Sequence, residues 1–183
     1  MSRPRVLFYV QHLLGIGHLK RATTLARAMS AAGLHVTVVS GGEFVPVIDN
    51  TGMDFVQLPP IRAIDRLFSG LADVNGKVIS NVLKEERRDI LLSLFNTLSP
   101  NILMIEMYPF GRRQLKFELT PLLETASRAD SKPVIVSSVR DILVEKGKPT
   151  QEEEMIEKAK GYFDHILVHG DPSFIPFQRT FPR

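Results

Sequence analysis

Six short apolar runs, separated by stretches with helical spacing, constrain the fold of this chain more than any other feature. Most of the runs are apolar at consecutive positions, which is typical of strands in a sheet that is covered on both faces. Strands that alternate with helices predict parallel pairing through right-handed crossovers. The expected strands are residues 5–11, 35–40, 54–58, 101–106, 133–138 and 165–170.

The segments between these runs supply the helices. Apolar residues from Leu19 to Met29 recur on one helical face, and Gly33 ends that helix where a left-handed residue costs least. A second helix is expected over residues 76–98, with the charges of "KEERRD" on a solvated face. In "RRQLKFELTPLLETASRA", Pro121 must either kink one helix or begin a second one.

These elements predict an α/β fold: one doubly wound, Rossmann-like parallel sheet with helices on both faces. The chain has 183 residues and is 44% hydrophobic, which is enough for a single core. The expected strand order is 3-2-1-4-5-6, so the order reverses between the first and fourth strands. Residues 59–75 are expected to form a loop.

Composition excludes several classes of function. The chain has no cysteine, which excludes disulfides, thiolate metal sites and a cysteine nucleophile, and favours a cytoplasmic location. The net charge is +3, but basic residues are scattered or paired with acids, so no nucleic-acid partner is expected. No apolar run approaches the roughly 20 residues that span a bilayer, and no metal site is expected.

The segment "HLLGIGHLKR", residues 12–21, follows the first strand at the point where ligands bind in open α/β sheets. Gly15 and Gly17 would let the backbone approach a ligand. The helix that begins near His18 would direct free N–H groups and its positive dipole end to the same point. The turn predicts a site for an anion or for developing charge, although such turns also use glycine for packing alone.

The turn departs from the dinucleotide-binding pattern. Lys20 replaces the third glycine of G-x-G-x-x-G, and Glu43 is displaced past Gly41 and Gly42 from the usual ribose-binding position. A P-loop is absent as well, because no G-K-[ST] follows. Gly41 and Gly42 remain candidate binding residues, and a module that binds NAD or a nucleotide remains an alternative.

Histidine and glutamate side chains supply the candidate catalytic groups. His18 could act as a general base near neutral pH, or it could cap the turn. Glu106 ends the fourth strand, so its carboxylate should face the first turn and bind a sugar hydroxyl or orient His18. His12 is the competing base in the same loop, and His169, at the end of the sixth strand, is a third candidate with a supporting role.

Two pairs of residues at strand ends are candidates for ligand binding. Arg112 and Arg113 begin a helix after the fourth strand, where guanidinium groups and the helix dipole favour a phosphate or carboxylate. The alternative is a solvated helix start. Arg140 and Asp141 follow the fifth strand and would hydrogen-bond a ligand or, as we favour, each other.

The segment "GIGHLKRATTLARAMSAAGLHVTVVSGG" resembles the first β-α-β unit of GT-B glycosyltransferases, where a G-x-G-H turn opens the N-terminal domain. It is similar in particular to the N-acetylglucosaminyltransferase of the peptidoglycan precursor. It is still more similar to bacterial predicted glycosyltransferases with "FGRRQLKFEL" and "HGDPSF" segments. The resemblance spans nearly the whole chain. It implies two Rossmann-like domains, of which the first holds the acceptor and supplies a base, while the second binds the nucleotide-sugar donor.

The resemblance further implies that residues 1–183 are the acceptor-side domain, that the donor-binding domain is missing, and that the chain alone is inactive. His18 matches the family's loop histidine. Expected partners are a nucleotide-diphosphate sugar as co-substrate, with no cofactor, a hydroxyl-bearing acceptor, the missing domain, and a membrane in peripheral contact. The alternative is half of a nucleotide-sugar 2-epimerase of similar fold, which needs carboxylates to move a sugar proton.

Overall fold

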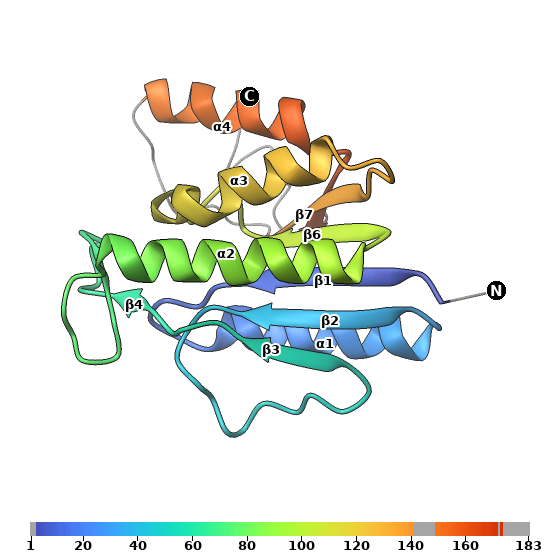
Figure 1. The fold of residues 1–183 in the computed structure, drawn as a ribbon, viewed down its shortest axis with the longest axis horizontal. Helices are drawn as coiled ribbons and strands as arrows, with labels where there is room; N and C mark the ends of the chain where they lie inside the picture. The colour runs from blue at the N-terminus through green and yellow to red at the C-terminus, as the bar shows by residue number, and fades with distance from the viewer. Residues whose placement is uncertain (1–2, 141–148, 172, 174–183) are drawn as a thin grey trace.

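A six-stranded parallel sheet forms the centre of the protein (Figure 1). The computed structural model describes residues 3–140, 149–171 and 173. The strands of the sheet are β1 (Arg5–Val10), β2 (His35–Ser40), β3 (Asp54–Gln57), β6 (Ile102–Glu106), β7 (Val134–Arg140) and β8 (His165–His169). Their spatial order is β3-β2-β1-β6-β7-β8. Both the Rossmann-like fold and the strand order are therefore confirmed.

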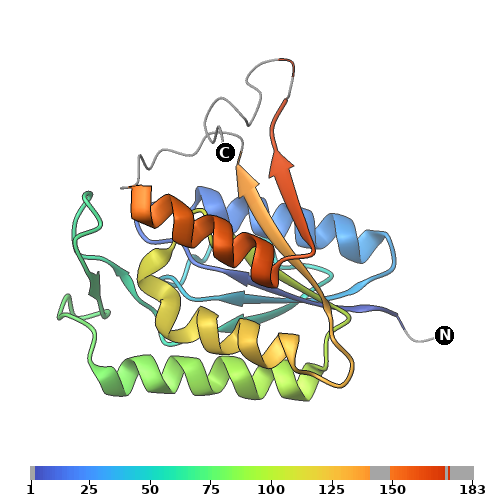
Figure 2. The same ribbon diagram turned by 90° about the horizontal axis from the view of Figure 1, so that it is seen from above.

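Helices cover both faces of this sheet. They are α1 (Gly17–Ala31), α2 (Asn81–Leu98), α3 (Lys116–Ser127) and α4 (Pro149–Tyr162), with a short 3₁₀ helix η1 (Arg113–Leu115) before α3. Figure 2 shows α1 and α2 on opposite sides of the sheet. Because side chains alternate along a strand, Leu7 and Tyr9 of β1 pack in the core with α2 and α3, whereas Val6 and Phe8 pack with α1.

The helix boundaries differ from the sequence prediction in one place. Helix α2 begins at Asn81 rather than at residue 76, because Ser80 caps it by accepting a hydrogen bond of 3.1 Å from the Leu83 amide. Pro121 lies inside α3, so the single-helix alternative is the observed one. Gly33 has the expected positive φ, +95°.

The predicted loop over residues 59–75 contains a small antiparallel sheet of its own. Its strands are β4 (Arg62–Ala63) and β5 (Leu71–Ala72). Two residues are too few to show the alternation that reveals a strand in a sequence. Figure 1 shows β4 at the end of the molecule toward which β1, β2 and β3 point, so this hairpin borders the carboxyl end of the sheet.

The prediction of a solvated face for "KEERRD" is wrong at Arg87, which is fully buried. Its guanidinium donates two hydrogen bonds, of 2.8 and 2.7 Å, to the Glu118 carboxylate. It also donates to the carbonyls of Gly41 (3.0 Å) and Pro59, and to the side-chain oxygen of Gln11 (3.1 Å). One buried side chain therefore holds the chain segments that follow β1, β2 and β3.

Tyr9 completes this buried cluster by donating its hydroxyl to Glu118. Burial raises the pKa of Tyr9 well above its usual value, and the Glu118 carboxylate raises it further. Burial lowers the pKa of Arg87, but Glu118 and Tyr9 together raise it above its usual value. The cluster is thus a neutral tyrosine beside a compensated ion pair.

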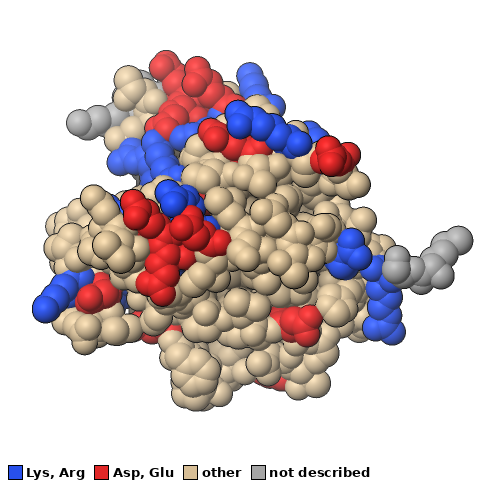
Figure 3. Space-filling view, in the orientation of Figure 1, with Lys and Arg blue, Asp and Glu red and all other residues tan. Residues whose placement is uncertain are grey.

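The surface is mixed in charge. Figure 3 shows basic and acidic side chains interspersed over α2 and α4, with uncharged surface between them.

At the edge of the sheet, β8 exposes Ile166, Leu167 and Val168 by 39–43% each. Among the described residues, no helix combines the length and apolar character needed to cross a membrane.

Candidate functional site

The end of β6 and the first turn of α1 bring two predicted residues together. Glu106 is fully buried, and its Oε1 lies 2.7 Å from His18 Nδ1. This contact follows from the pairing of β1 with β6, as the predicted strand order requires. An ionised carboxylate only accepts hydrogen bonds, so beside an ionised Glu106 a neutral His18 donates from Nδ1 and keeps Nε2 as an acceptor.

Arg21, which the sequence analysis did not single out, shares the same carboxylate oxygen. Its Nη2 donates to Glu106 Oε1 and lies 3.5 Å from His18 Nδ1. His18 and Arg21 are three residues apart on α1, so they face the same side of the helix. This spacing in "GHLKR" is the signal that could have revealed Arg21.

Two atoms of this group have unmet hydrogen-bonding capacity. Glu106 Oε2 and Arg21 Nε are buried and have no hydrogen-bond partner among the described residues. Buried polar atoms are usually paired, and their exceptions gather where water or a ligand completes the bonds. The group is therefore suited to an additional polar partner.

The next two strands extend the polar group. Ser138 of β7 lies opposite Glu106 in the sheet, and its hydroxyl is 2.8 Å from His169 Nε2 on β8. Burial lowers the pKa of His169, the charge of Arg21 lowers it further, and the Glu106 carboxylate opposes both. His169 is thus within electrostatic range of the His18 site. A serine within a strand carries no pattern that predicts this role for Ser138.

His12 is enclosed rather than open to the crevice. Its ring packs against Gly42, where an added Cβ would lie 2.4 Å from the nearest ring atom. Neither ring nitrogen has a hydrogen-bond partner in the described part of the chain. Burial lowers the pKa of His12. Arg112 and His18 lower it further, whereas Glu43 raises it. His12 is therefore a neutral imidazole near pH 7.

The four candidate glycines fall into two kinds. A Cβ at Gly41 would lie 2.1 Å from the Gln11 side-chain oxygen, so Gly41, like Gly42, is required by the packing of neighbouring side chains. A Cβ at Gly15 or Gly17 would meet nothing within 4 Å, and neither residue has a positive φ. The described residues thus explain the first pair but leave open space above the second.

The predicted cations occupy different positions around this end of the sheet. Arg112 has a φ of +62° and donates from Nε to the Gln11 carbonyl at 2.8 Å, which holds it beside the end of β1. Arg113 is exposed in η1. Arg140 is partly exposed and lies opposite His169 in the sheet, while Asp141 lies outside the described residues, so the predicted pairing of these two stays a prediction.

Many apolar side chains are exposed outside the six-stranded sheet. They lie on the connections after β1 and β2, on the β4–β5 hairpin and its continuation, and at the start of α2. Leu67 is 88% exposed and Phe44 is 72% exposed. We call this set the apolar rim: Leu14, Ile16, Phe44, Val47, Ile64, Leu67, Phe68, Val74, Val78 and Val82. A large contiguous apolar patch marks a place where another molecule or domain binds, whereas single exposed apolar side chains are ordinary.

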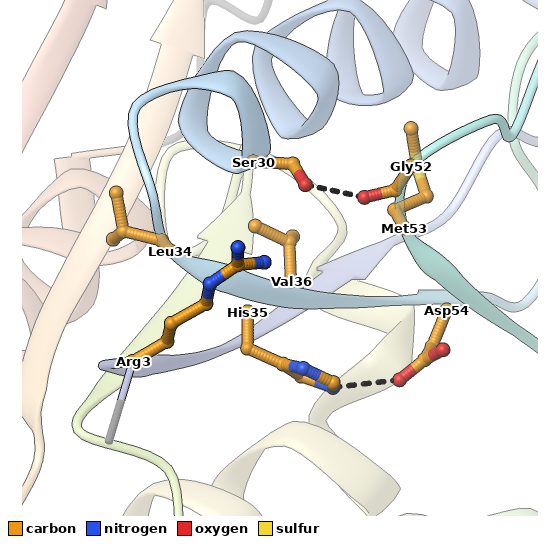
Figure 4. A pocket seen from close by; sticks show the side chains of 8 residues that line it. All are labelled: Arg3, Ser30, Leu34, His35, Val36, Gly52, Met53 and Asp54. Atoms are coloured by element: carbon orange, nitrogen blue, oxygen red, sulfur yellow. Dashed lines mark hydrogen bonds and ion pairs between the residues drawn. The ribbon is translucent and has the colours of Figure 1, made fainter. Parts of the chain in front are cut away.

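A shallow pocket of about 280 Å³ lies at the opposite, amino end of the strands (Figure 4). His35 and Asp54, the first residues of β2 and β3, form an ion pair of 2.8 Å on its wall. Both side chains are about half exposed, and the lining includes none of the predicted site residues. Ligands of open α/β sheets bind at the carboxyl ends, so the His18 site remains the candidate.

Metal-ligating side chains do not cluster in the part of the chain that the structure describes. In residues 3–140, 149–171 and 173, no three His, Asp or Glu side chains come together in a way that could hold a metal ion. The chemistry available is that of a histidine beside a buried carboxylate and an arginine, at a helix start. A proton acceptor with a fixed orientation is the strongest function that this arrangement offers.

Comparison with solved structures relates the fold to glycosyltransferases. The structure of SsfS6, a glycosyltransferase from Streptomyces sp. SF2575, aligns with a TM-score of 0.55 at 16% identity. The alignment covers 96% of this chain and 53% of that one. SsfS6 complexed with thymidine diphosphate aligns with a TM-score of 0.51 at 17% identity, over 91% of this chain and 48% of that one.

The chain therefore spans about half the length of the glycosyltransferase chains whose fold it shares. No family model matches the sequence, and no curated protein matches it significantly. At 16–17% identity the likeness shows a common fold alone. The narrower resemblance to the peptidoglycan-precursor enzyme stays a prediction.

Proposed function

We propose that this chain is the acceptor-side half of a GT-B glycosyltransferase, which moves a sugar from a nucleotide-sugar donor to an acceptor hydroxyl. The observation that carries the proposal is the 2.7 Å contact between His18 Nδ1 and Glu106 Oε1 at the end of β6. It orients an imidazole whose second nitrogen can accept a proton. The fold, shared with half of a solved glycosyltransferase, supports the same conclusion.

In the proposed reaction, His18 Nε2 takes the proton from the acceptor hydroxyl. The acceptor oxygen then bonds to the anomeric carbon of the donor sugar, and the bond from that carbon to the nucleoside diphosphate breaks. The electron pair leaves with the diphosphate. Glu106 accepts the hydrogen bond from Nδ1 and stabilises the imidazolium that forms. Neither a metal nor a cofactor takes part in these steps.

Two features support a second half that closes over this end of the sheet. The apolar rim is suited to contact with another domain, with an apolar part of the acceptor, or with a membrane surface. The space above Gly15 and Gly17 is open, and α1 begins without a side-chain cap or an acidic residue in its first turn. Such a helix start favours an anion, which here would be a diphosphate.

The test replaces His18 by Ala in a protein that contains both this chain and a donor-binding half. Release of nucleoside diphosphate is measured with nucleotide sugars and hydroxyl acceptors. Loss of a general base lowers the rate by about 100-fold to 10,000-fold. If His18 only caps the turn, the variant should lose about 0.5 to 2 kcal/mol of stability and keep its turnover per folded molecule.

His12→Ala is the control, because His12 lies in the same loop and is enclosed. Full turnover in the His18 variant with a large loss in the His12 variant would move the base to His12. The purified chain alone is expected to transfer no sugar. Product from a nucleotide sugar without any acceptor would favour the epimerase instead, and calorimetric binding of NAD would favour a nucleotide-binding module.

A further inference from the structure

Arg21 lies in a position that governs which state the histidine and glutamate of the site adopt. The Glu106 carboxylate is fully buried, and its Oε1 receives hydrogen bonds from both His18 and Arg21. A buried carboxylate with no compensating charge is costly, and it gains a proton unless a cation lies beside it. Arg21 is that cation on α1.

We propose that Arg21 is a positioning residue: its charge keeps the His18–Glu106 pair free of an additional proton near neutral pH, so that His18 Nε2 can accept one. This inference deepens the proposed function, because it concerns the same site. It rests on the two hydrogen bonds that converge on Glu106 Oε1 and on the 3.5 Å between Arg21 Nη2 and His18 Nδ1.

The protonation states of the pair explain why this charge matters. When Glu106 is ionised and His18 neutral, the proton lies on Nδ1 and Nε2 is free. If the pair takes up one proton, the result is either a carboxyl group that donates to Nδ1 or an imidazolium beside a carboxylate. These two forms differ only in the position of the shared proton, and in both of them Nε2 carries a hydrogen. A protonated pair therefore cannot act as the base.

Other ionisable groups around the pair do not replace Arg21. His169 lies on β8, and burial lowers its pKa. The charge of Arg21 lowers this pKa further, whereas the Glu106 carboxylate opposes the change. His12 follows the end of β1, and its pKa is lowered by burial and further by His18. Both imidazoles are thus neutral near pH 7. Among the described residues, Arg21 is the cation that donates a hydrogen bond to Glu106.

The experiment is a pH titration of the 183-residue chain by NMR, with ¹⁵N-labelled histidine, in the wild type and in Arg21→Gln. The nitrogen shifts report whether His18 Nε2 carries a proton. Removal of the Arg21 charge, whose Nη2 lies 3.5 Å from His18 Nδ1 at a partly buried site, is expected to raise the midpoint of Nε2 protonation by about one pH unit or more. Arg21→Lys keeps the charge and should restore most of the wild-type behaviour.

Arg27→Gln is the matched control. It makes the same substitution on the same helix and removes a cation that also pairs with a carboxylate, Asp49, but at an exposed position. Its His18 titration should coincide with that of the wild type. Amide spectra establish that each variant is folded.

A folded Arg21→Gln variant that titrates like the wild type would overturn the inference, and so would an equal shift in Arg27→Gln. A shift in Arg21→Gln that the lysine does not reduce would also count against the charge as the cause. The titration needs no sugar transfer. A failure of the proposed glycosyltransferase function would therefore leave its outcome unchanged.

Discussion

The buried guanidinium of Arg87 offers the sharpest test of how the carboxyl end of the sheet is held together. Replacing Arg87 by Met removes its hydrogen bonds to Glu118, Gly41, Pro59 and Gln11 and leaves the Glu118 carboxylate buried without a cation. Breaking a buried ion pair by removing one partner costs about 3 to 5 kcal/mol. That is a large share of the stability of a domain, which is roughly 5 to 15 kcal/mol.

The assay is urea unfolding followed by far-UV circular dichroism, because the chain has no tryptophan. With a slope of about 2 kcal/mol per molar urea, the expected loss lowers the unfolding midpoint by roughly 1.5 to 2.5 M. The deficit of the variant should shrink as the pH is lowered, because protonation neutralises the orphaned carboxyl group. Combining Arg87→Met with Glu118→Gln should recover part of the loss, since no charge is then left buried.

Arg88→Met is the control, since Arg88 is the next residue on α2, but its side chain is 37% exposed and pairs with Asp89 at the surface. Its unfolding should change by no more than about 0.5 kcal/mol. An Arg87→Met variant that loses less than about 1 kcal/mol at neutral pH would refute the argument, as would a double variant less stable than the single one.

Two further changes probe other parts of the molecule. Hydrogen bonds from Lys116 and Lys158 lower the pKa of Glu154 to about 2, so this α3–α4 contact stabilises the fold above about pH 4.5 and is lost as the pH falls toward 2. Because Glu154 is 37% exposed, the gain over Glu154→Gln in urea unfolding should be at most about 1 kcal/mol at pH 6 and vanish near pH 2. Gly42→Ala should cost about 1 to 3 kcal/mol through its clash with the neighbouring imidazole, whereas Gly17→Ala should cost nothing. Equal losses in urea unfolding would show that the space above Gly17 is not open.

The sequence predicts the sheet well because its signals are local. Each of the six runs is apolar enough to mark a strand, and the alternation with helices leaves few topologies to choose from. The strand order then places the end of β6 beside the turn after β1. The contact between His18 and Glu106 was predictable for this reason, even though 88 residues separate them.

What the sequence hides depends on contacts between distant side chains. Arg87 looks like part of a charged, solvated run, although it falls on the same helical stripe as Leu91 and Phe95, at intervals of four residues. Only the position of Glu118 on α3 shows that the guanidinium has a buried partner. The β4–β5 hairpin escapes detection because its strands have two residues each.

The exposed apolar strand at the edge of the sheet has a practical consequence for work with the purified chain. β8 presents Ile166, Leu167 and Val168 to solvent, and an edge strand offers its outer backbone groups to any other extended segment. Aggregation during concentration or refolding is therefore expected to begin there, by strand-to-strand association of two copies. A lysine in place of Leu167 is the kind of change by which natural edge strands avoid such association.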